Sequence, residues 1–425
     1  MAALLFAVSA LFLLLISAPV FIAILAPTLL SFELFGPPIP AMVLAQQMMQ
    51  GINKFSLLAI PLFMFSADII SRGEISNRLL RLVETTVGHL TGGVAITTAI
   101  TCALFGAVSG IGTAAIISIG PIVYPVLLKQ GYSAGFSAGL ILSASTLAML
   151  VPPSVAMILY SLATNNSVGG VFLAGLSAGI IFMLLLTIYC YLYARIRKTG
   201  HQSRASWQER FISLKEAGWS LGLPLIIFGG IYAGTFTPTE AASGACVYAL
   251  FVETLIYRKL KFHELFDITA RSAVVIASLL ILLAAGSALA YYMTLQDIPQ
   301  LTAGFMEDSS STEVILSINV IFLITGMFID PNSAIIVLTP LFAPIAQAAS
   351  IDPLHLGAVI VLNVAIGMMT PPFGLNLFIG MATFRVSFLE ICRGIYPYIG
   401  IALLALIIVS YVPALITWLP TTVGL

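Results

Sequence analysis

The most regular feature of this sequence is a series of long apolar stretches separated by short polar segments. A helix needs about 20 apolar residues to cross the hydrocarbon core of a bilayer. We expect a membrane helix at each of the stretches 3–31, 41–70, 169–194, 217–235, 239–257, 272–296 and 394–418. Two further regions, 86–163 and 314–384, are also apolar but are interrupted by Gly, Pro and Asn.

The composition shows what surrounds these helices. Hydrophobic residues make up 60% of the 425 residues and charged residues only 8%, whereas soluble domains have about 25% charged residues. So few charges cannot cover a surface in water, so most of the chain faces lipid. A formal net charge of zero argues against a nucleic-acid partner. The four cysteines lie far apart in apolar stretches, which is typical of buried packing residues and predicts no transition-metal site.

The basic residues predict the orientation in the membrane. The segment 195–216 contains six Lys and Arg residues, whereas 297–313 contains four acidic residues and no Lys or Arg. Because loops rich in Lys and Arg stay in the cytoplasm, 196–216 is predicted to be cytoplasmic and 297–313 to lie outside. This pattern places the N-terminus in the cytoplasm and the C-terminus outside.

The two interrupted regions match each other at one offset of 219 residues. No gap is needed between 115 and 164. The matches are 115–117 with 334–336, Pro121 and Pro125 with Pro340 and Pro344, Pro152-Pro153 with Pro371-Pro372, and 163–164 with 382–383. So many matches on one offset indicate an internal repeat.

Each copy has the same plan of a hairpin followed by a broken helix. The hairpin tips are polar, at 109–113 and 330–333, and the breaks fall at 150–154 and 369–373. Hairpin arms of about 15–18 residues are too short for ordinary spans, so we predict re-entrant hairpins.

The charges beside the two hairpins indicate that the copies are inverted. Basic residues flank the first hairpin (Arg81, Lys129) and acidic residues flank the second (Glu313, Asp352). Inverted repeats with paired broken helices are typical of secondary transporters. Broken helices offer carbonyls to a cation and N-termini to an anion. The alternative is that each Pro-Pro only kinks a packed helix, but its presence in both copies favours a binding site.

The repeat divides the chain into four predicted units. Residues 1–85 and 195–313 would form scaffold helices and connecting arms, the second unit including the cytoplasmic loop. Residues 86–194 and 314–425 would form the two transport repeats.

Asp330 is the polar residue that most invites a functional interpretation. It lies in an apolar surrounding, and a carboxylate within the membrane is by default a functional hypothesis. The alternative is a helix cap before Pro331, and both roles are compatible. Around the two breaks stand further polar residues that form either a site or bonds between helices: Ser143, Ser145, Ser154, Asn363 and Asn376.

Three other motifs favour structural interpretations. Thr237-Pro238-Thr239-Glu240 is typical of a capping box. The segments 131–135 and 175–179 match the nucleophile-elbow pattern, but such spacing of small residues is also typical of closely packed membrane helices. The sequence contains neither HExxH nor a Walker A motif. We therefore do not predict an enzyme.

Five segments together are characteristic of one family: GAVSGIGTAA (106–115), LVPPSVAMILY (150–160), GTFTPTEAA (234–242), GMFIDPNSA (326–334) and IGMMTPPFGLNLF (366–378). Over nearly its whole length the chain resembles the large membrane subunit of tripartite ATP-independent periplasmic (TRAP) transporters. The second and fourth segments look most like sialic acid transporters, with C4-dicarboxylate transporters as the alternative.

The resemblance implies an elevator-type transporter of the bacterial inner membrane that uses a sodium gradient. It also implies two partners, which are a periplasmic substrate-binding protein and a small four-helix membrane subunit on a separate chain. Family substrate contacts correspond here to Ser109, Ser154 and Asp330. Family sodium sites correspond to the neighbourhoods of Ser109, Leu147, Leu150, Pro152, Gly326, Gly367 and Thr370. Ile111 departs from the small polar residue usual in the first tip.

A channel or a purely structural membrane subunit is the alternative from another class. A channel needs a continuous polar path, whereas the polar residues here gather near mid-membrane. A structural subunit has no need of two matched helix breaks. The sequence therefore favours sodium-coupled uptake of an organic acid, with sialic acid preferred.

Overall fold

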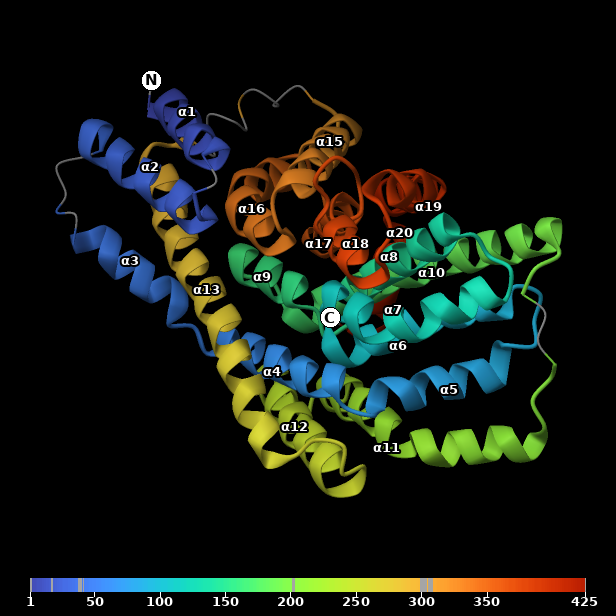
Figure 1. Ribbon diagram of the computed structural model, residues 1–425. Coiled ribbons are helices and arrows are strands. Elements are labelled where there is room, and N and C mark those ends of the chain that lie inside the picture. The colour runs from blue at the N-terminus through green and yellow to red at the C-terminus, as the bar shows by residue number, and fades with distance from the viewer. Residues whose placement is uncertain are drawn as a thin grey trace.

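The protein is built almost entirely of helices (Figure 1). The computed structural model describes residues 2–16, 18–36, 40, 42–200, 203–298, 304 and 309–424, and no β-strand occurs among them. Within these residues nine helices are long and apolar enough to cross a membrane, and a bent pair of helices would make ten. The predicted all-α polytopic membrane fold is therefore confirmed.

One group of helices forms an outer layer along one side and the lower edge of the molecule as drawn in Figure 1. In Figure 1 the long helix α13 runs from α2 past α3 and α4 to α12, and it packs against α2, α3 and α4. The outer layer consists of α1 (Ala2–Leu15), α2 (Val20–Phe35), α3 (Met42–Ile52), η1 (Phe55–Leu58), α4 (Ala59–Arg72), α5 (Ile75–Val87), α11 (Trp207–Tyr232), α12 (Pro238–Phe251), the π-helical turn η2 (Val252–Ile256) and α13 (Phe262–Leu295).

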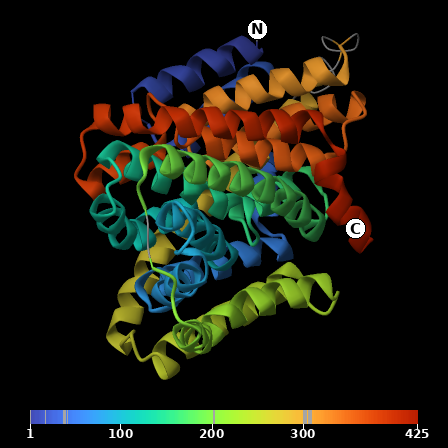
Figure 2. The ribbon, with the colours of Figure 1, turned by 90° about the vertical axis from the view of Figure 1, so that its right-hand side faces the viewer.

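The remaining helices form a compact bundle. Its centre is made by α8 and α17, in which residues 136–150 and 355–367 are all buried. The bundle consists of α6 (Gly93–Ser109), α7 (Gly112–Lys129), α8 (Ala134–Leu150), α9 (Val155–Thr164), α10 (Val168–Arg197), α15 (Ser311–Phe328), α16 (Pro331–Ala348), α17 (Pro353–Gly367), α18 (Leu375–Phe384), α19 (Phe388–Tyr411) and α20 (Ala414–Val423). Figure 2 shows several of these helices side by side, with α11 of the outer layer at one edge.

The helix boundaries follow the repeat found in the sequence. Helices α7 and α16 begin and end at residues 219 apart, α8 and α17 begin 219 apart, and α6 and α15 end 219 apart. The first copy thus has a hairpin, α6–α7, followed by a broken helix, α8–α9, and the second copy repeats this order in α15–α18. The inversion of one copy relative to the other stays a prediction, as do the four unit boundaries.

Three of the predicted membrane stretches contain more than one helix. The stretch 3–31 is divided between α1 and α2 at Pro19, and 394–418 is divided between α19 and α20 at Pro413. Proline lacks a backbone N–H and disfavours a helical residue before it, so a helix ends there even in an apolar run. The stretch 41–70 is divided into α3, η1 and α4 near Asn53-Lys54. Within the loop 297–313, residues 299–303 and 305–308 lie outside the described part of the chain.

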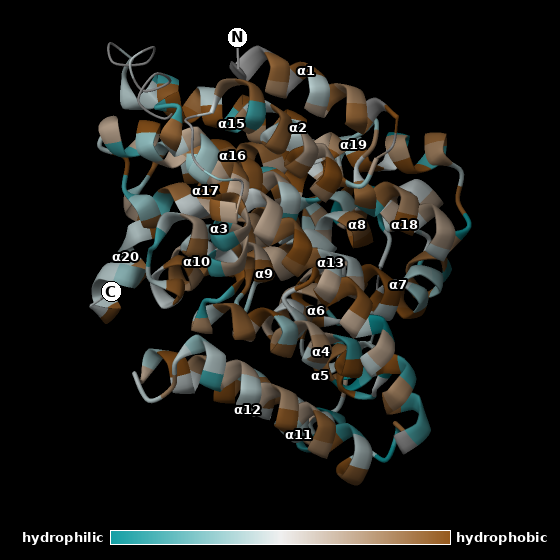
Figure 3. Ribbon diagram, turned by 90° about the vertical axis from the view of Figure 1, so that its left-hand side faces the viewer, coloured by the Kyte–Doolittle hydropathy of each residue, from teal (hydrophilic) through white to brown (hydrophobic). Residues whose placement is uncertain are grey.

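Apolar residues occur along most of the helices, as the hydropathy colouring of the ribbon in Figure 3 shows, and many large ones are exposed. Leu225, Val247 and Phe266 are 70%, 68% and 77% exposed. A soluble monomer rarely exposes large contiguous apolar surface, whereas lipid is a suitable solvent for it. The capping box at the start of α12 is also confirmed, because Thr237 and Glu240 each accept a hydrogen bond from the other's backbone N–H.

Candidate functional site

The tip of the first hairpin packs against the break of the first helix. Helix α6 ends at Ser109, and Gly110 has a positive φ of 65° that favours glycine. A side chain at Gly110 would collide with the carbonyl oxygen of Pro153 and would also approach Ser154. The contact of Gly110 with Pro153 and Ser154 thus brings Ser109 and Ser154, two of the three predicted substrate residues, close to each other.

The tip of the second hairpin is organised by Asp330. Its Oδ1 accepts hydrogen bonds from the backbone N–H groups of Asn332 and Ser333, both 3.1 Å away, and its Oδ2 accepts one from the Ser333 hydroxyl. Asp330 therefore caps α16, which is the structural role considered for it. At the offset of 219, Ile111 is the equivalent residue, and it precedes α7 without a side-chain cap.

The two helix breaks also follow the prediction. Helices α8 and α9 meet at an angle of 42° across 151–154, and α17 and α18 are separated by 368–374. At the second break the Thr370 hydroxyl donates to the carbonyl oxygen of Ile366 at 2.7 Å. The Asn376 side chain donates to Ser145 Oγ at 3.4 Å, which joins the two broken helices.

The predicted sodium residues fall into two groups. Gly326 and Gly367 are in close backbone contact, since a Cβ added at Gly367 would lie 2.5 Å from the carbonyl carbon of Gly326. Ser109 lies beside the break that contains Pro152. At the first break, the Leu147 carbonyl accepts the N–H of Val151, and the Leu150 carbonyl lies 3.4 Å from where a Cβ at Gly175 of α10 would be.

Several buried side-chain oxygens near the tips have no hydrogen-bond partner within the described residues. They are Ser109 Oγ, Ser143 Oγ, Ser154 Oγ and Asn376 Oδ1, all in side chains that are fully buried. Buried polar atoms are normally hydrogen-bonded, so each unpartnered atom needs an explanation. A bound ion or ligand is one such explanation, and hydroxyl and amide oxygens suit a hard cation.

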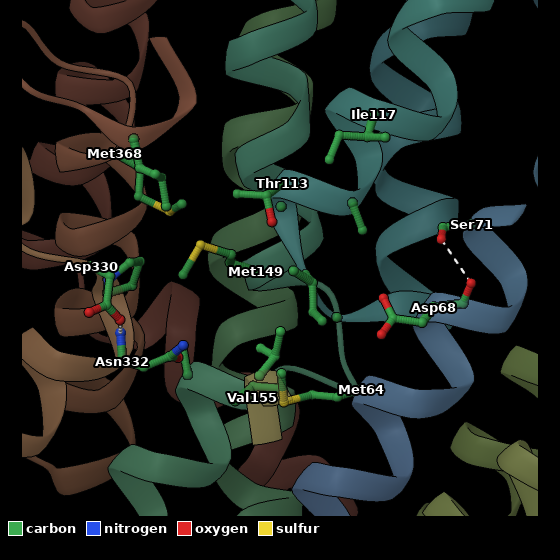
Figure 4. A pocket seen from close by; sticks show the side chains of 18 residues that line it. Met64, Asp68, Ser71, Thr113, Ile117, Met149, Val155, Asp330, Asn332 and Met368 are labelled. Atoms are coloured by element: carbon green, nitrogen blue, oxygen red, sulfur yellow. Dashed lines mark hydrogen bonds between the residues drawn. The ribbon is translucent and has the colours of Figure 1, made fainter. Parts of the chain in front are cut away.

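A cavity of about 310 Å³ lies where the two tips and the two breaks meet the outer layer. Its walls come from the first tip (110–114), the second tip (330–332), α8, α9, α18 and the second break (Met149, Val155, Ala156, Met368, Leu375), and helices α4 and α13 (Met64, Asp68, Ser71, Val275), with Ile117 of α7 at the edge. Figure 4 shows Asp330 and Asn332 on one side of this cavity and Asp68 on the other. Ser109 and Ser154 do not line it themselves, but their neighbours Gly110 and Val155 do.

Asp68 lines the cavity, although the sequence did not single it out as a candidate. Its carboxylate accepts a hydrogen bond from Ser272 on α13, and the Ser71 hydroxyl donates to its backbone carbonyl at 2.9 Å. The sequence could have indicated it, because Asp68 is the one acidic residue in the apolar run of α4. A carboxylate within the membrane is a functional hypothesis for Asp68 just as it is for Asp330.

The likeness to known proteins first defines the class of this fold. The structure of the YdaH transporter of Alcanivorax borkumensis superposes with a TM-score of 0.71, is 13% identical and covers 99% of both chains. At that identity the likeness concerns the fold alone. The fold is thus one found in a membrane transporter.

The sequence comparisons then give the family. Residues 7–415 match the model of the tripartite ATP-independent periplasmic transporter, DctM component. The ectoine TRAP transporter large permease protein TeaC of Halomonas elongata is 39% identical over 96% of both chains. The C4-dicarboxylate TRAP transporter large permease protein DctM of Pseudomonas aeruginosa is 37% identical over 93% of both chains. The chain therefore belongs to the DctM family of TRAP transporter large permeases, which are transporter components and not enzymes.

Proposed function

We propose that this protein imports a small organic acid by sodium-coupled secondary transport. One observation carries the proposal: a single cavity is lined by both hairpin tips, by the second helix break and by the residues of α8 and α9 that flank the first break, and α4 and α13 form its opposite wall. A site between the bundle and the outer layer suits an elevator mechanism, in which the bundle carries the ligand past a fixed outer layer.

Sodium would bind where the hairpin tips meet the broken helices. The unpartnered oxygens of Ser109, Ser154 and Asn376 support the first location. The backbone contact of Gly326 with Gly367, next to Thr370, supports the second. Coordination of sodium there would couple the ion gradient to closure of the tips around the substrate.

The substrate would arrive on a soluble binding protein, and a separate small membrane subunit would support the outer layer. The sequences of the motifs at 150–160 and 326–334 favour sialic acid, whereas the relatives of 39% and 37% identity are named for ectoine and C4-dicarboxylates. The proposal is therefore an organic acid, with Ser109, Ser154 and Asp330 nearest to it. The membrane would be the bacterial inner membrane, with the N-terminus in the cytoplasm.

The experiment is uptake by proteoliposomes that contain the large and small subunits, with the binding protein outside. We expect uptake to require all three components and sodium, and Asp330→Asn to impair it, because the substitution removes a charge from the cavity but keeps an oxygen that caps α16. Asp352→Asn is the matched control, since Asp352 caps α17 in the same way, through the N–H groups of Leu354 and His355, away from the cavity. Full-rate uptake without a binding protein would refute the tripartite proposal.

A further inference from the structure

The cavity carries negative charge on two sides and no described basic side chain in its wall. Asp68 and Asp330 are the only ionisable residues among the described residues that line it. Arg72, one turn further along α4, is exposed and is not part of the wall. The cavity therefore has no Lys or Arg to bind an anionic substrate directly.

The carboxylate of Asp68 is fixed by the outer layer. Ser272, which is 1% exposed on α13, donates a hydrogen bond to it. Figure 4 shows the Asp68 carboxylate across the cavity from Asp330 and Asn332. Both α4 and α13 belong to the outer layer. The Asp68 carboxylate therefore faces a ligand bound between the two hairpin tips of the bundle.

Anion-attracting groups lie at a different part of the same site. The helices α7, α9 and α18 begin beside the cavity, at the N-cap residues Ile111, Ser154 and Gly374, and none has a side-chain cap, although the Asn376 N–H of α18 donates to the Met368 carbonyl at 3.0 Å. Free N–H groups at a helix N-terminus attract an anion. The unpartnered, fully buried hydroxyls of Ser109 and Ser154 stand beside two of these N-termini and add hydrogen-bond donors.

The site is asymmetric because the two hairpin tips differ at one equivalent position. The carboxylate of Asp330 caps the N-terminus of α16. At the equivalent position, Ile111 has no polar side chain, so the first N–H groups of α7 have no side-chain cap. One end of the site therefore suits an anionic group and the other suits a cationic group.

We propose that the substrate of this site is a small zwitterion, with its carboxylate toward Ser109 and Ser154 and its cationic group toward Asp68 and Asp330. This inference rests on the transport function proposed above. A dicarboxylate would add two negative charges to those of the two aspartates, and all four would need bound cations, whereas a zwitterion adds no net charge. Two relatives at 39% identity are named as transporters of ectoine, which is a zwitterion with an amidinium and a carboxylate group.

The test measures ligand-dependent thermal stability of the purified complex of large and small subunits, in sodium and in choline buffers. The probes are ectoine, succinate and N-acetylneuraminate, and the readout is the probe concentration that gives half-maximal stabilisation. We expect ectoine to stabilise the complex in sodium. Asp68→Asn, which keeps an acceptor for Ser272, should weaken the ectoine effect about tenfold and improve the response to succinate.

Asp267→Asn is the control, because Asp267 is an exposed acidic residue on α13 outside the cavity wall. Stabilisation by succinate or N-acetylneuraminate without any by ectoine would overturn the zwitterion and leave transport of an organic acid standing. An equal ectoine response in Asp68→Asn and wild type would also overturn it. An ectoine response that is the same in choline would contradict sodium coupling but support the zwitterion.

Discussion

Replacing Gly367 by alanine tests the predicted role of the contact between α15 and α17. A Cβ at this position would lie 2.5 Å from the carbonyl carbon and 2.6 Å from the Cα of Gly326. Both are backbone atoms, so no side chain can rotate away to make room. The added methyl group must instead push the end of α15 away from the second helix break.

The size of the displacement follows from ordinary contact distances. A normal Cβ contact begins at 3.4 Å, so the backbones must separate by about 0.9 Å. Overpacking of this kind costs about 1–3 kcal/mol, and the gain in helix propensity offsets at most about 1 kcal/mol. Binding sites tolerate errors of only about 0.5 Å, so we expect sodium binding near Gly326 and Thr370 to weaken by about tenfold or more.

The assay is the sodium concentration that gives half-maximal thermal stabilisation of the purified complex. Gly326→Ala should have a smaller effect, because its Cβ would lie 3.2 Å from Gly367. Gly400→Ala is the matched control, since nothing lies within 4 Å of a Cβ there. If Gly367→Ala retained the wild-type sodium response, this contact would not be part of a sodium site.

Three further predictions concern topology, sodium and stability. In intact cells of a cysteine-free variant, an impermeant thiol reagent should label a cysteine at Ser309 but not one at Ser203, and the reverse pattern would contradict the inverted repeat. Thr370→Ala should raise the sodium concentration needed for half-maximal transport more than it changes substrate affinity, because it removes a hydroxyl at the second break; unchanged sodium dependence would exclude Thr370 as a ligand. Glu253→Leu should lower the thermal unfolding midpoint, since it removes the fully buried carboxylate that accepts hydrogen bonds from the N–H groups of Glu74 and Ile75 at 2.8–2.9 Å, and each buried unpaired donor costs about 1–3 kcal/mol. An unchanged midpoint would show that these bonds do not stabilise the start of α5.

Much of the bundle could be predicted because its signals are local. Proline, glycine and polar residues interrupt apolar helices, and the offset of 219 residues showed the interruptions twice. In the structure the helices are interrupted at 110–111, 329–330, 151–154 and 368–374, each overlapping a predicted tip or break. The stretches 3–31, 41–70 and 394–418 were wrong as single helices, because counting apolar residues gave too little weight to Pro19, to Asn53-Lys54 and to Pro413.

The cavity itself depends on contacts that the sequence pattern does not contain. The wall formed by α4 and α13 arises from packing between distant parts of the chain, so Asp68 was not connected to Asp330. Repeat analysis could not single out Asp68 either, because its equivalent at the offset of 219 is Ser287. Whether Asp330 caps a helix or belongs to a site was open in the sequence; the structure shows that it caps α16 and also lines the cavity, and its role in binding stays a prediction.

Sodium-driven accumulation tests the central proposal most directly. Proteoliposomes with both membrane subunits, supplied with the binding protein and a labelled organic acid that it binds, would be given an inward sodium gradient or equal sodium on both sides. We predict that the substrate accumulates above its external concentration only with the gradient, and that a sodium ionophore abolishes the accumulation. Equal accumulation when potassium replaces sodium throughout would contradict sodium-coupled transport by this protein.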